Sequence, residues 1–214
     1  MLANEVPGEI IHAGEILDPA KAQVLGDTVL AVFKDYISQP TTPYAEIGSL
    51  NIIPSATKES SYDTSQRCNS ISLGIDDQTV VNEGIEKFAS LLRNGGVTSD
   101  LDTDADFFVG TAGGGDWHFD GRREYRLLVN LASTPLGLLI AKVWDERDYE
   151  DFFGEDRFRK NGPSDPTRIE QIDYDSGEGV LLDNMREARL QVPHAGVRAD
   201  GKVFMRLYAS HPND

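Results

Sequence analysis

Apolar residues recur at two different spacings along the chain, and the change of spacing divides it into two parts. In the first part, apolar positions three or four residues apart predict one helix over residues 18–38 and another over residues 80–93. Asp18 before a proline is a typical helix start, and Gly95-Gly96 is a typical stop. The pattern assigns no element between residues 44 and 80.

From residue 106 onward the apolar residues form short runs separated by turn-forming residues, which is typical of strands. Asp200-Gly201 predicts a two-residue hairpin turn between the last two runs. Several short strands after helical segments predict an α+β fold with a mainly β core, an antiparallel barrel or jelly roll with the helices packed outside it. The predicted strands are Phe107–Val109, Tyr125–Ala132, Leu136–Trp144, Gly179–Leu182, Val192–Val197 and Lys202–Ser210.

We expect the chain to form a single domain. Residues 1–104 would form a helical and irregular layer, and residues 105–214 would form the barrel. The segment 145–176 interrupts the strands and is rich in Asp, Glu, Arg, Gly and Pro, with phenylalanines embedded in it. A connection of this length is either a functional lid or a solvated surface excursion anchored by its phenylalanines, and the composition is compatible with both.

Composition narrows the range of partners. The 20 basic and 36 acidic residues give a formal net charge of -16, which repels nucleic-acid backbones and anionic lipid surfaces. Cys68 is the only cysteine, so the chain can form neither an intrachain disulfide nor a cysteine-rich zinc site. No apolar run reaches the roughly 20 residues of a membrane span, and the N-terminus lacks the pattern of a secretory signal. We therefore expect a cytoplasmic protein that binds neither nucleic acid nor membranes.

One group of polar residues in the predicted barrel has the composition of a metal site. His118 and Asp120 lie two positions apart, so in a strand both side chains point to the same side, and His194 begins a later strand. Two imidazoles and one carboxylate can occupy one face of an octahedral ferrous ion and leave the other face for a co-substrate and dioxygen. Taken singly, a His-x-Asp triplet arises by chance in many proteins. The order of the residues, with the triplet after the glycine run 113–115 and a second histidine at a strand start, favours an oxygenase.

Arg206 lies twelve positions beyond His194, on the last predicted strand. A guanidinium at this place could hold the far carboxylate of a keto acid through paired hydrogen bonds. The alternative is an ordinary surface ion pair in an acidic chain. The nearby metal candidates favour the carboxylate role.

The series His118-x-Asp120, His194 and Arg206 resembles the iron(II)/2-oxoglutarate-dependent dioxygenases, whose fold is the double-stranded β-helix, or jelly roll. The resemblance covers the predicted barrel and not the first hundred residues. It implies that the two histidines and the aspartate bind Fe(II), and that Arg206 pairs with the C5 carboxylate of 2-oxoglutarate. Many members of the family have Arg-x-Ser, whereas here Tyr208 stands two positions after the arginine, and its hydroxyl would replace that of the serine.

Arg122 and Arg126 belong to a cluster of three arginines directly after the triplet. They either bind an acidic group of the substrate or pair with acidic residues of the segment 145–176. Asn130, on the same side of the predicted strand as Arg126, and Tyr125, on the opposite side, are candidates for contact with the keto acid. A hydrogen-bonded role in the core is equally compatible with both.

The resemblance implies an enzyme that uses Fe(II), 2-oxoglutarate and O2 and that releases succinate while it oxidises its substrate. The compact chain favours hydroxylation of a small molecule, such as an amino acid or a natural-product intermediate. Two alternatives stay open: a peptide or protein-residue hydroxylase of the same fold, and a non-catalytic metal-binding protein with a cupin-like barrel. Asp120 argues against halogenation, because the halogenating branch of the family has a small residue in its place.

Overall fold

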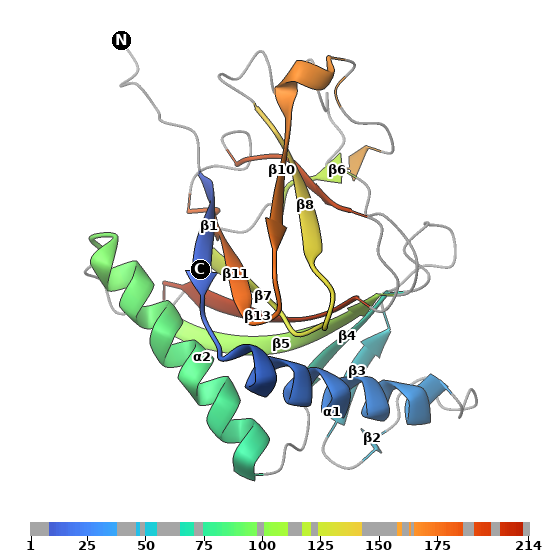
Figure 1. The fold of residues 1–214 in the computed structure, drawn as a ribbon. Helices are drawn as coiled ribbons and strands as arrows, with labels where there is room; N and C mark the ends of the chain where they lie inside the picture. The colour runs from blue at the N-terminus through green and yellow to red at the C-terminus, as the bar shows by residue number, and fades with distance from the viewer. Residues whose placement is uncertain are drawn as a thin grey trace.

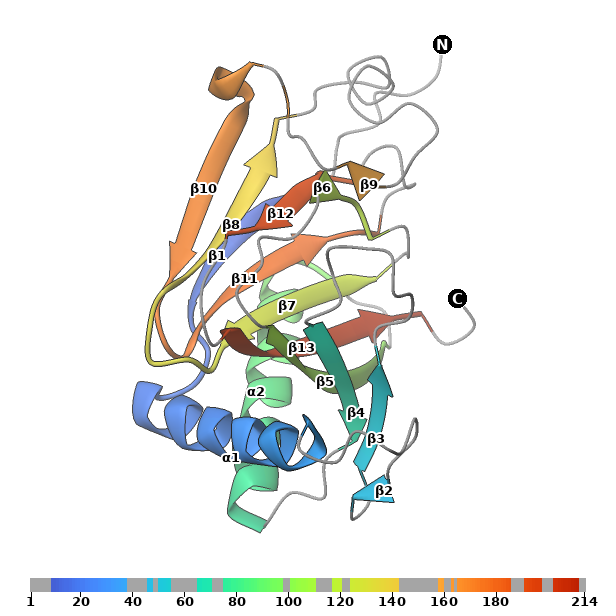
Figure 2. The ribbon, with the colours of Figure 1, turned by 90° about the vertical axis from the view of Figure 1, so that its right-hand side faces the viewer.

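The computed structural model describes residues 9–37, 46–47, 50–54, 65–70, 75–97, 101–110, 117–120, 124–142, 158–159, 163, 165–185, 191–197 and 202–211. In this part of the chain two antiparallel sheets face each other, and two helices pack on the outer face of the larger sheet (Figure 1 and Figure 2).

The larger sheet has eight strands in the order β1-β11-β7-β13-β5-β4-β3-β2. Strand β13 pairs with β5 on one side and with β7 on the other, and this places Arg206 between Asp106 and Leu128. The strands are β1 (Ile10–Glu15), β2 (Glu46–Ile47), β3 (Leu50–Pro54), β4 (Ser65–Ser70), β5 (Asp102–Gly110), β7 (Tyr125–Asn130), β11 (Glu178–Asp183) and β13 (Lys202–Ser210).

The smaller sheet has five strands in the order β10-β8-β12-β6-β9. Between β5 and β13 the chain passes repeatedly from one sheet to the other, so that β11-β7-β13-β5 faces β10-β8-β12-β6. This arrangement is the double-stranded β-helix, and the predicted fold class is confirmed. The strands are β6 (Trp117–His118), β8 (Leu136–Ala141), β9 (Phe158–Arg159), β10 (Ile169–Tyr174) and β12 (His194–Gly196), and a 3-10 turn (Pro166–Arg168) precedes β10.

Helix α1 (Pro19–Ile37) lies where the apolar spacing predicts it. The Asp18 carboxylate caps it by accepting hydrogen bonds from the backbone N–H groups of Ala20 and Lys21, at 2.9 and 3.1 Å. The cap and the apolar face are both local signals, which is why the helix and its first residue could be predicted.

Helix α2 (Ile75–Asn94) begins earlier than the sequence predicts. Its first turn carries Asp76 and Asp77, which interact favourably with the N-terminal end of the helix dipole but belong to no apolar face. The periodic pattern starts only at Val80, where α2 begins to pack on the sheet. The helix ends as predicted at the glycine pair, with Gly96 at a φ of 88°.

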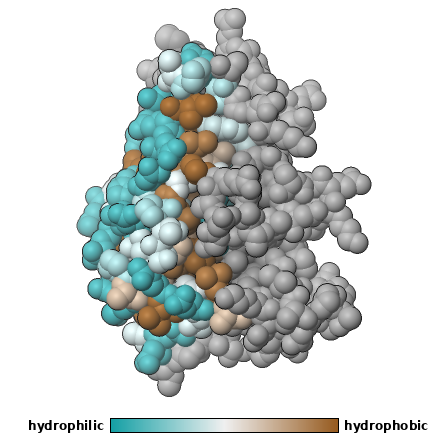
Figure 3. All heavy atoms as spheres, turned by 45° about the vertical axis from the view of Figure 1, so that its right-hand side comes forward, coloured by the Kyte–Doolittle hydropathy of each residue, from teal (hydrophilic) through white to brown (hydrophobic). Residues whose placement is uncertain are grey.

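Alternating residues of the larger sheet serve two different cores. One set faces the helices, with Leu127, Val129, Met205 and Leu207 packed in a single cluster with Phe88. The alternate set faces the smaller sheet, where Leu128, Val180 and Leu182 pack against Leu136 and Leu138 of β8. Figure 3 shows hydrophilic residues over much of the described surface, with hydrophobic residues in a narrower band beside them.

The predicted hairpin between the last two strands is wrong. Strand β12 pairs with β6 and β8 in the smaller sheet, whereas β13 pairs with β5 and β7 in the larger one. Asp200-Gly201, which suggested the hairpin, lies outside the described residues. Turn-forming residues mark a change of direction, but they do not determine whether the next strand stays in the same sheet.

The segment 145–176 is not wholly an insertion, because its last part is a strand of the barrel. Strand β10 pairs along its full length with β8, and Tyr174 is buried. Strand β10 lies at the edge of its sheet and mixes apolar residues with exposed polar residues such as Glu170 and Gln171, so its composition resembles that of a loop. Residues 143–157, where a lid or an excursion was expected, lie outside the described residues.

The first 104 residues contribute strands that the sequence pattern did not reveal. Strand β1 pairs with β11, and β4, β3 and β2 extend the larger sheet beyond β5. The sequence of β4, Ser65–Ser70, has no apolar alternation, so only pairing with β5 identifies it as a strand.

Candidate metal centre

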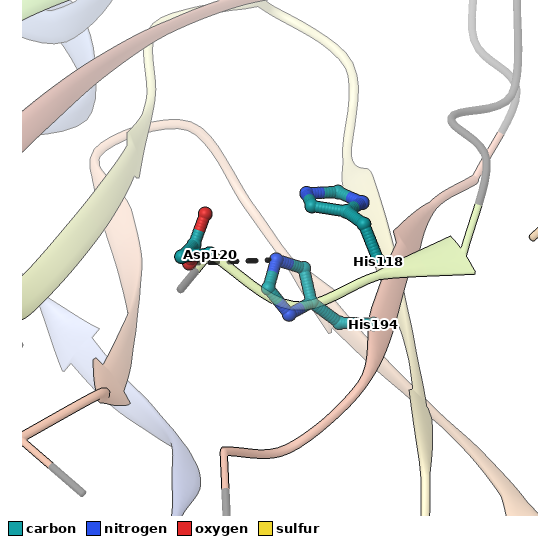
Figure 4. A group of neighbouring side chains, drawn as sticks. All are labelled: His118, Asp120 and His194. Carbon is teal, nitrogen blue, oxygen red and sulfur yellow. Dashed lines mark ion pairs between the residues drawn. The ribbon is translucent and has the colours of Figure 1, made fainter. Parts of the chain in front are cut away.

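The pairing of two short strands brings the two histidines together. His118 ends β6, His194 begins β12, and the two residues are direct partners in the antiparallel pair. Their ring centroids are 4.4 Å apart (Figure 4). Trp117 and Phe119 point to the other side of the strand and pack with Ala195, which leaves His118 facing the space between the sheets.

Asp120 completes the group two positions after His118. Donor atoms of His118, Asp120 and His194 all lie within 4.8 Å of one another. The Nε2 atom of His194 is 3.8 Å from Oδ2 of Asp120, and the dashed line in Figure 4 marks this pair. The structure therefore brings together the three residues that the sequence suggested as metal ligands.

The hydrogen bonding of His194 fits a metal ligand. Its Nδ1 lies 3.1 Å from the backbone carbonyl oxygen of Val192, so Nδ1 carries the proton that it donates. The Nε2 lone pair then points toward Asp120 and His118. Burial lowers the pKa of His194 below the ordinary histidine value, although the negative charge of Asp120 opposes this shift. The imidazole is therefore neutral at pH 7, as a metal ligand must be.

Asp120 is ionised in the same environment. Burial alone would raise the pKa of its carboxyl group, but the positive charge of Arg126, a hydrogen bond from Asn184, and the charges that His194 and His118 carry once acid protonates them hold the pKa well below its usual range. Two imidazoles and one carboxylate form the donor set of non-haem iron centres with open coordination positions. The residues present therefore fit a divalent iron site.

Arg126 points toward the metal ligands rather than toward solvent. Its Nη1 group donates to Oδ1 of Asp120, and its Nε and Nη2 groups donate to Oε1 of Glu124. The side chain is only 12% exposed. Arg126 is thus bound to two carboxylates of this chain, which weakens its candidacy as a substrate-binding residue. Arg122 lies outside the described residues.

Arg206 is buried between the sheets and is not a surface ion-pair partner. Its Nε group donates to Oδ1 of Asp106 at 2.5 Å, and its Nη2 group donates to Oδ2 of the same carboxylate. The Tyr208 hydroxyl donates to Oδ2 of Asp106 at 2.9 Å. The Tyr208 ring lies between the two arginines, with its centroid 5.1 Å from Cζ of Arg126 and 5.5 Å from Cζ of Arg206.

Asn130 and Tyr125 have structural positions that argue against contact with a keto acid. Both amide hydrogens of Asn130 are used, by the carbonyl oxygens of Thr134 and Tyr174, and its Oδ1 accepts from the backbone of Ala132. These bonds fix the turn after β7 and leave no amide donor for a ligand. Tyr125 packs in the apolar cluster between the larger sheet and the helices. Successive residues of a strand point to opposite faces, so Tyr125 and Arg126 lie on opposite faces of β7.

Sequence reasoning missed three buried polar residues of this region: Asp106, Glu124 and Asn184. Asp106 directly precedes the apolar pair Phe107-Phe108, and Asn184 directly follows an apolar strand. A polar residue at such a boundary is a weak signal, because most polar residues beside strands simply face solvent. Their role follows only from the strand pairing, which places each of them beside an arginine or a metal ligand.

Comparison with known proteins gives the fold and little else. No family model matches the chain, and no curated protein matches it. Among solved structures, AviO1 from Streptomyces viridochromogenes Tue57 is similar with a TM-score of 0.60 and 12% identity, over 97% of this chain and 91% of that one. HygX from Streptomyces hygroscopicus, solved with nickel and 2-oxoglutarate bound, is similar with a TM-score of 0.55 and 8% identity, over 97% of this chain and 84% of that one. A prolyl-4-hydroxylase from Pseudomonas putida is similar with a TM-score of 0.53 and 10% identity, over 95% of this chain and 92% of that one.

In the part of the chain that the structure describes, no helix has the length and apolar character needed to cross a membrane.

The similar structures include a 2-oxoglutarate-bound protein and a hydroxylase, and they cover nearly the whole chain. At these low identities the similarity shows that this chain has the fold of those proteins.

Proposed function

We propose that this protein is an iron(II)- and 2-oxoglutarate-dependent oxygenase that hydroxylates a small molecule and converts 2-oxoglutarate to succinate and CO2. The observation that carries the proposal is the convergence of His118, Asp120 and His194 within a double-stranded β-helix. The convergence joins residues far apart in the sequence, and it places them on the inner side of the smaller sheet.

The chain supplies the ligands and the environment of the reaction. His118, Asp120 and His194 would hold Fe(II), which supplies the oxygen-activating chemistry when it is bound. The neutral His194 and the ionised Asp120 need no proton loss before they bind the cation. Apolar side chains between the sheets, including Leu128 and Leu182, keep water away from the reacting groups.

Arg206 is the residue best placed to bind the distal carboxylate of 2-oxoglutarate. Asp106 occupies the edge of the guanidinium formed by Nε and Nη2. A guanidinium has a second edge, formed by Nη1 and Nη2, and a second carboxylate can bind there. Tyr208, which the resemblance suggested as a direct contact, donates its hydroxyl to Asp106 and so helps to hold the arginine in place.

A small-molecule substrate is supported by the size and the charge of the chain. The chain has 214 residues and a net charge of -16, which disfavours polyanionic partners. The similarity to the Pseudomonas putida prolyl-4-hydroxylase keeps hydroxylation of a peptide or protein residue as the second candidate.

Succinate release tests the proposal directly. Purified protein with Fe(II), 2-oxoglutarate and air would be screened against amino acids, natural-product intermediates and proline-containing peptides. We expect substrate-dependent succinate formation, which His194→Ala abolishes and which Tyr125→Phe, on the helix side of the sheet, leaves intact. In the absence of oxygen, Fe(II) and 2-oxoglutarate together should produce a weak visible charge-transfer band.

Two results would overturn the proposal. One is the absence of this band in the wild-type protein. The other is an equal band in wild type and His194→Ala. Metal content after purification is a poor guide, because other divalent metals bind such a donor set more tightly than Fe(II).

A further inference from the structure

Asp120 and three other residues form a closed ring of hydrogen bonds. Asn184 donates from Nδ2 to Oδ2 of Asp120 at 2.7 Å, and its backbone N–H donates to the carbonyl oxygen of Glu124 at 3.1 Å. The Glu124 carboxylate accepts hydrogen bonds from Nε and Nη2 of Arg126. Nη1 of Arg126 donates to Oδ1 of Asp120 and so closes the ring. Each carboxylate oxygen of Asp120 therefore has its own donor, one from each side of the ring.

The ring is buried and anchored at its far side. Asn184 is 1% exposed and Glu124 is 6% exposed. The backbone carbonyl oxygen of Asn184 accepts a hydrogen bond from Nε2 of Gln191 at 3.1 Å, and Gln191 is itself buried. Because every member is held by another, rotation of the Asp120 carboxylate would break a hydrogen bond in a place where water cannot readily replace it.

Stability alone does not account for such a ring. Buried ion pairs are often no more stabilising than apolar residues of similar size, because taking the charges out of water is costly. The ring holds two carboxylates, Asp120 and Glu124, against the single positive charge of Arg126. The excess negative charge lies next to the neutral imidazole of His194, where a bound cation would offset it.

We propose that Asn184 and the Arg126–Glu124 pair are positioning residues that hold the Asp120 carboxylate in one orientation toward the cation. This inference rests on the proposed metal site. A carboxylate whose two oxygens are held from opposite sides binds a cation through one oxygen, and this leaves positions open for the co-substrate and O2. The proposal also gives Arg126 a role other than the substrate binding that the sequence suggested.

The test is metal affinity without turnover. Metal-free protein would be titrated with Mn2+ by electron paramagnetic resonance and with Co2+ by visible absorption, in the absence of 2-oxoglutarate. Removal of a residue that orients a metal ligand costs about 10- to 100-fold in metal affinity. We expect losses of this size for Asn184→Ala and Arg126→Met, and a smaller loss for Arg126→Lys, which retains the charge. The Co2+ spectrum should change in shape, which a purely structural role would not cause.

A matched control comes from the same strand. Tyr125→Phe alters the neighbouring position of Arg126 on the opposite face of β7, and we expect it to leave the Mn2+ affinity unchanged. Urea denaturation would show which variants fold. If Arg126→Met does not fold, Asn184→Ala decides the question, because it removes an uncharged group.

The possible outcomes separate this proposal from the proposed function. Folded Asn184→Ala with wild-type Mn2+ affinity and an unchanged Co2+ spectrum overturns the positioning role and leaves the oxygenase proposal intact. A wild-type protein that binds neither metal at the His118, Asp120 and His194 site overturns both. Weakened metal binding in Asn184→Ala and Arg126→Met, with Tyr125→Phe unaffected, supports the positioning role.

Discussion

At the scale of single residues, the site depends on buried charges whose partners are fixed by strand register. Arg206 lies opposite Asp106 in the β13–β5 pair, and the two side chains form a buried ion pair. Such a pair couples stability to ligand binding, because a change in one partner leaves the other charged and buried.

The two effects can be separated at Arg206. We expect Arg206→Met to lower the free energy of unfolding by about 3–5 kcal/mol, because it leaves the Asp106 charge without its partner. The double variant Arg206→Met/Asp106→Asn should recover much of this loss, since neither charge remains. Both variants should bind 2-oxoglutarate at least tenfold more weakly, as measured by titration of the anaerobic charge-transfer band. Retention of wild-type affinity in the folded double variant would show that Arg206 does not bind the co-substrate.

The buried His194 should make the metal-free protein sensitive to mild acid. Burial lowers the pKa of His194 in the folded chain, whereas the unfolded chain takes up this proton at about the ordinary histidine value of 6.5. The unfolded state is therefore favoured as the pH falls below about 6.5, and the loss of stability continues until the lowered pKa is passed. Urea denaturation between pH 8 and pH 5 should show this fall.

The pH-dependent fall should be smaller in His194→Gln, which cannot take up a proton. His211 is exposed in the folded chain, so the same substitution there is the control and should leave the slope as in wild type. An identical slope in His194→Gln and wild type would assign the acid sensitivity to other groups.

The sequence could predict the metal-ligand candidates, because their residue types are those that bind metals. It could not predict which residues hydrogen-bond or pair with the residues of the site. His118, Asp120 and His194 stand out by residue type and order, and the structure brings them together. Asp106 and Asn184 carry no such signal, because an aspartate or an asparagine beside a strand is usually solvated. Only the register of β5 with β13 and the approach of residue 184 to residue 120 show what they bind.

At the scale of elements, helix α1 comes into close backbone contact with the residue after β7 at one glycine. A β-carbon on Gly26 of α1 would lie 2.3 Å from the carbonyl oxygen of Leu131, whereas one on Gly84 of α2 would lie 2.8 Å from the flexible end of Met205. Alanine favours a helix over glycine by about 1 kcal/mol at either position. The two glycines therefore form a matched pair that differs in what the added methyl group meets.

We expect Gly26→Ala to destabilise the protein by about 1–3 kcal/mol, because the helix must move away from a rigid carbonyl group. Gly84→Ala should stay within about 1 kcal/mol of wild type, since the Met205 side chain can rotate. Urea denaturation of both variants measures the difference. Equal stabilities would mean that α1 can shift on the sheet at no cost.

Elements with local signals were predicted, and elements defined by pairing were not. Helix α1 has a cap and a buried apolar face, and both are visible in the sequence. Strands β4 and β10 are polar on one or both faces, so they become strands only through their neighbours β5 and β8. The wrong hairpin between β12 and β13 has the same cause, because a turn signal contains no information about sheet membership.

At the scale of the whole molecule, the two ligand-bearing strands have little direct pairing with each other in the described part of the chain. The larger sheet is covered by two helices, whereas β6 and β12 are joined through one residue pair, His194 with His118. A cation held by these histidines and Asp120 would add a second link between the two strands, beside this residue pair. Metal binding should therefore stabilise the whole fold.

This coupling gives a prediction for heat denaturation. A ligand that binds only the folded state at a concentration 100 times its dissociation constant adds about 2.7 kcal/mol of stability. For a chain of this size, each kcal/mol raises Tm by about 2–4 °C. We expect Mn2+ or Ni2+ to raise Tm by about 5–10 °C.

With 36 acidic residues, the surface also attracts divalent cations without specific binding, so Ca2+ at the same concentration and ionic strength is the necessary control. Calcium prefers oxygen ligands and should have little effect, and His118→Ala should remove the shift caused by Mn2+. A shift of equal size with Ca2+, or with Mn2+ in His118→Ala, would assign the stabilisation to the acidic surface rather than to the two histidines and Asp120.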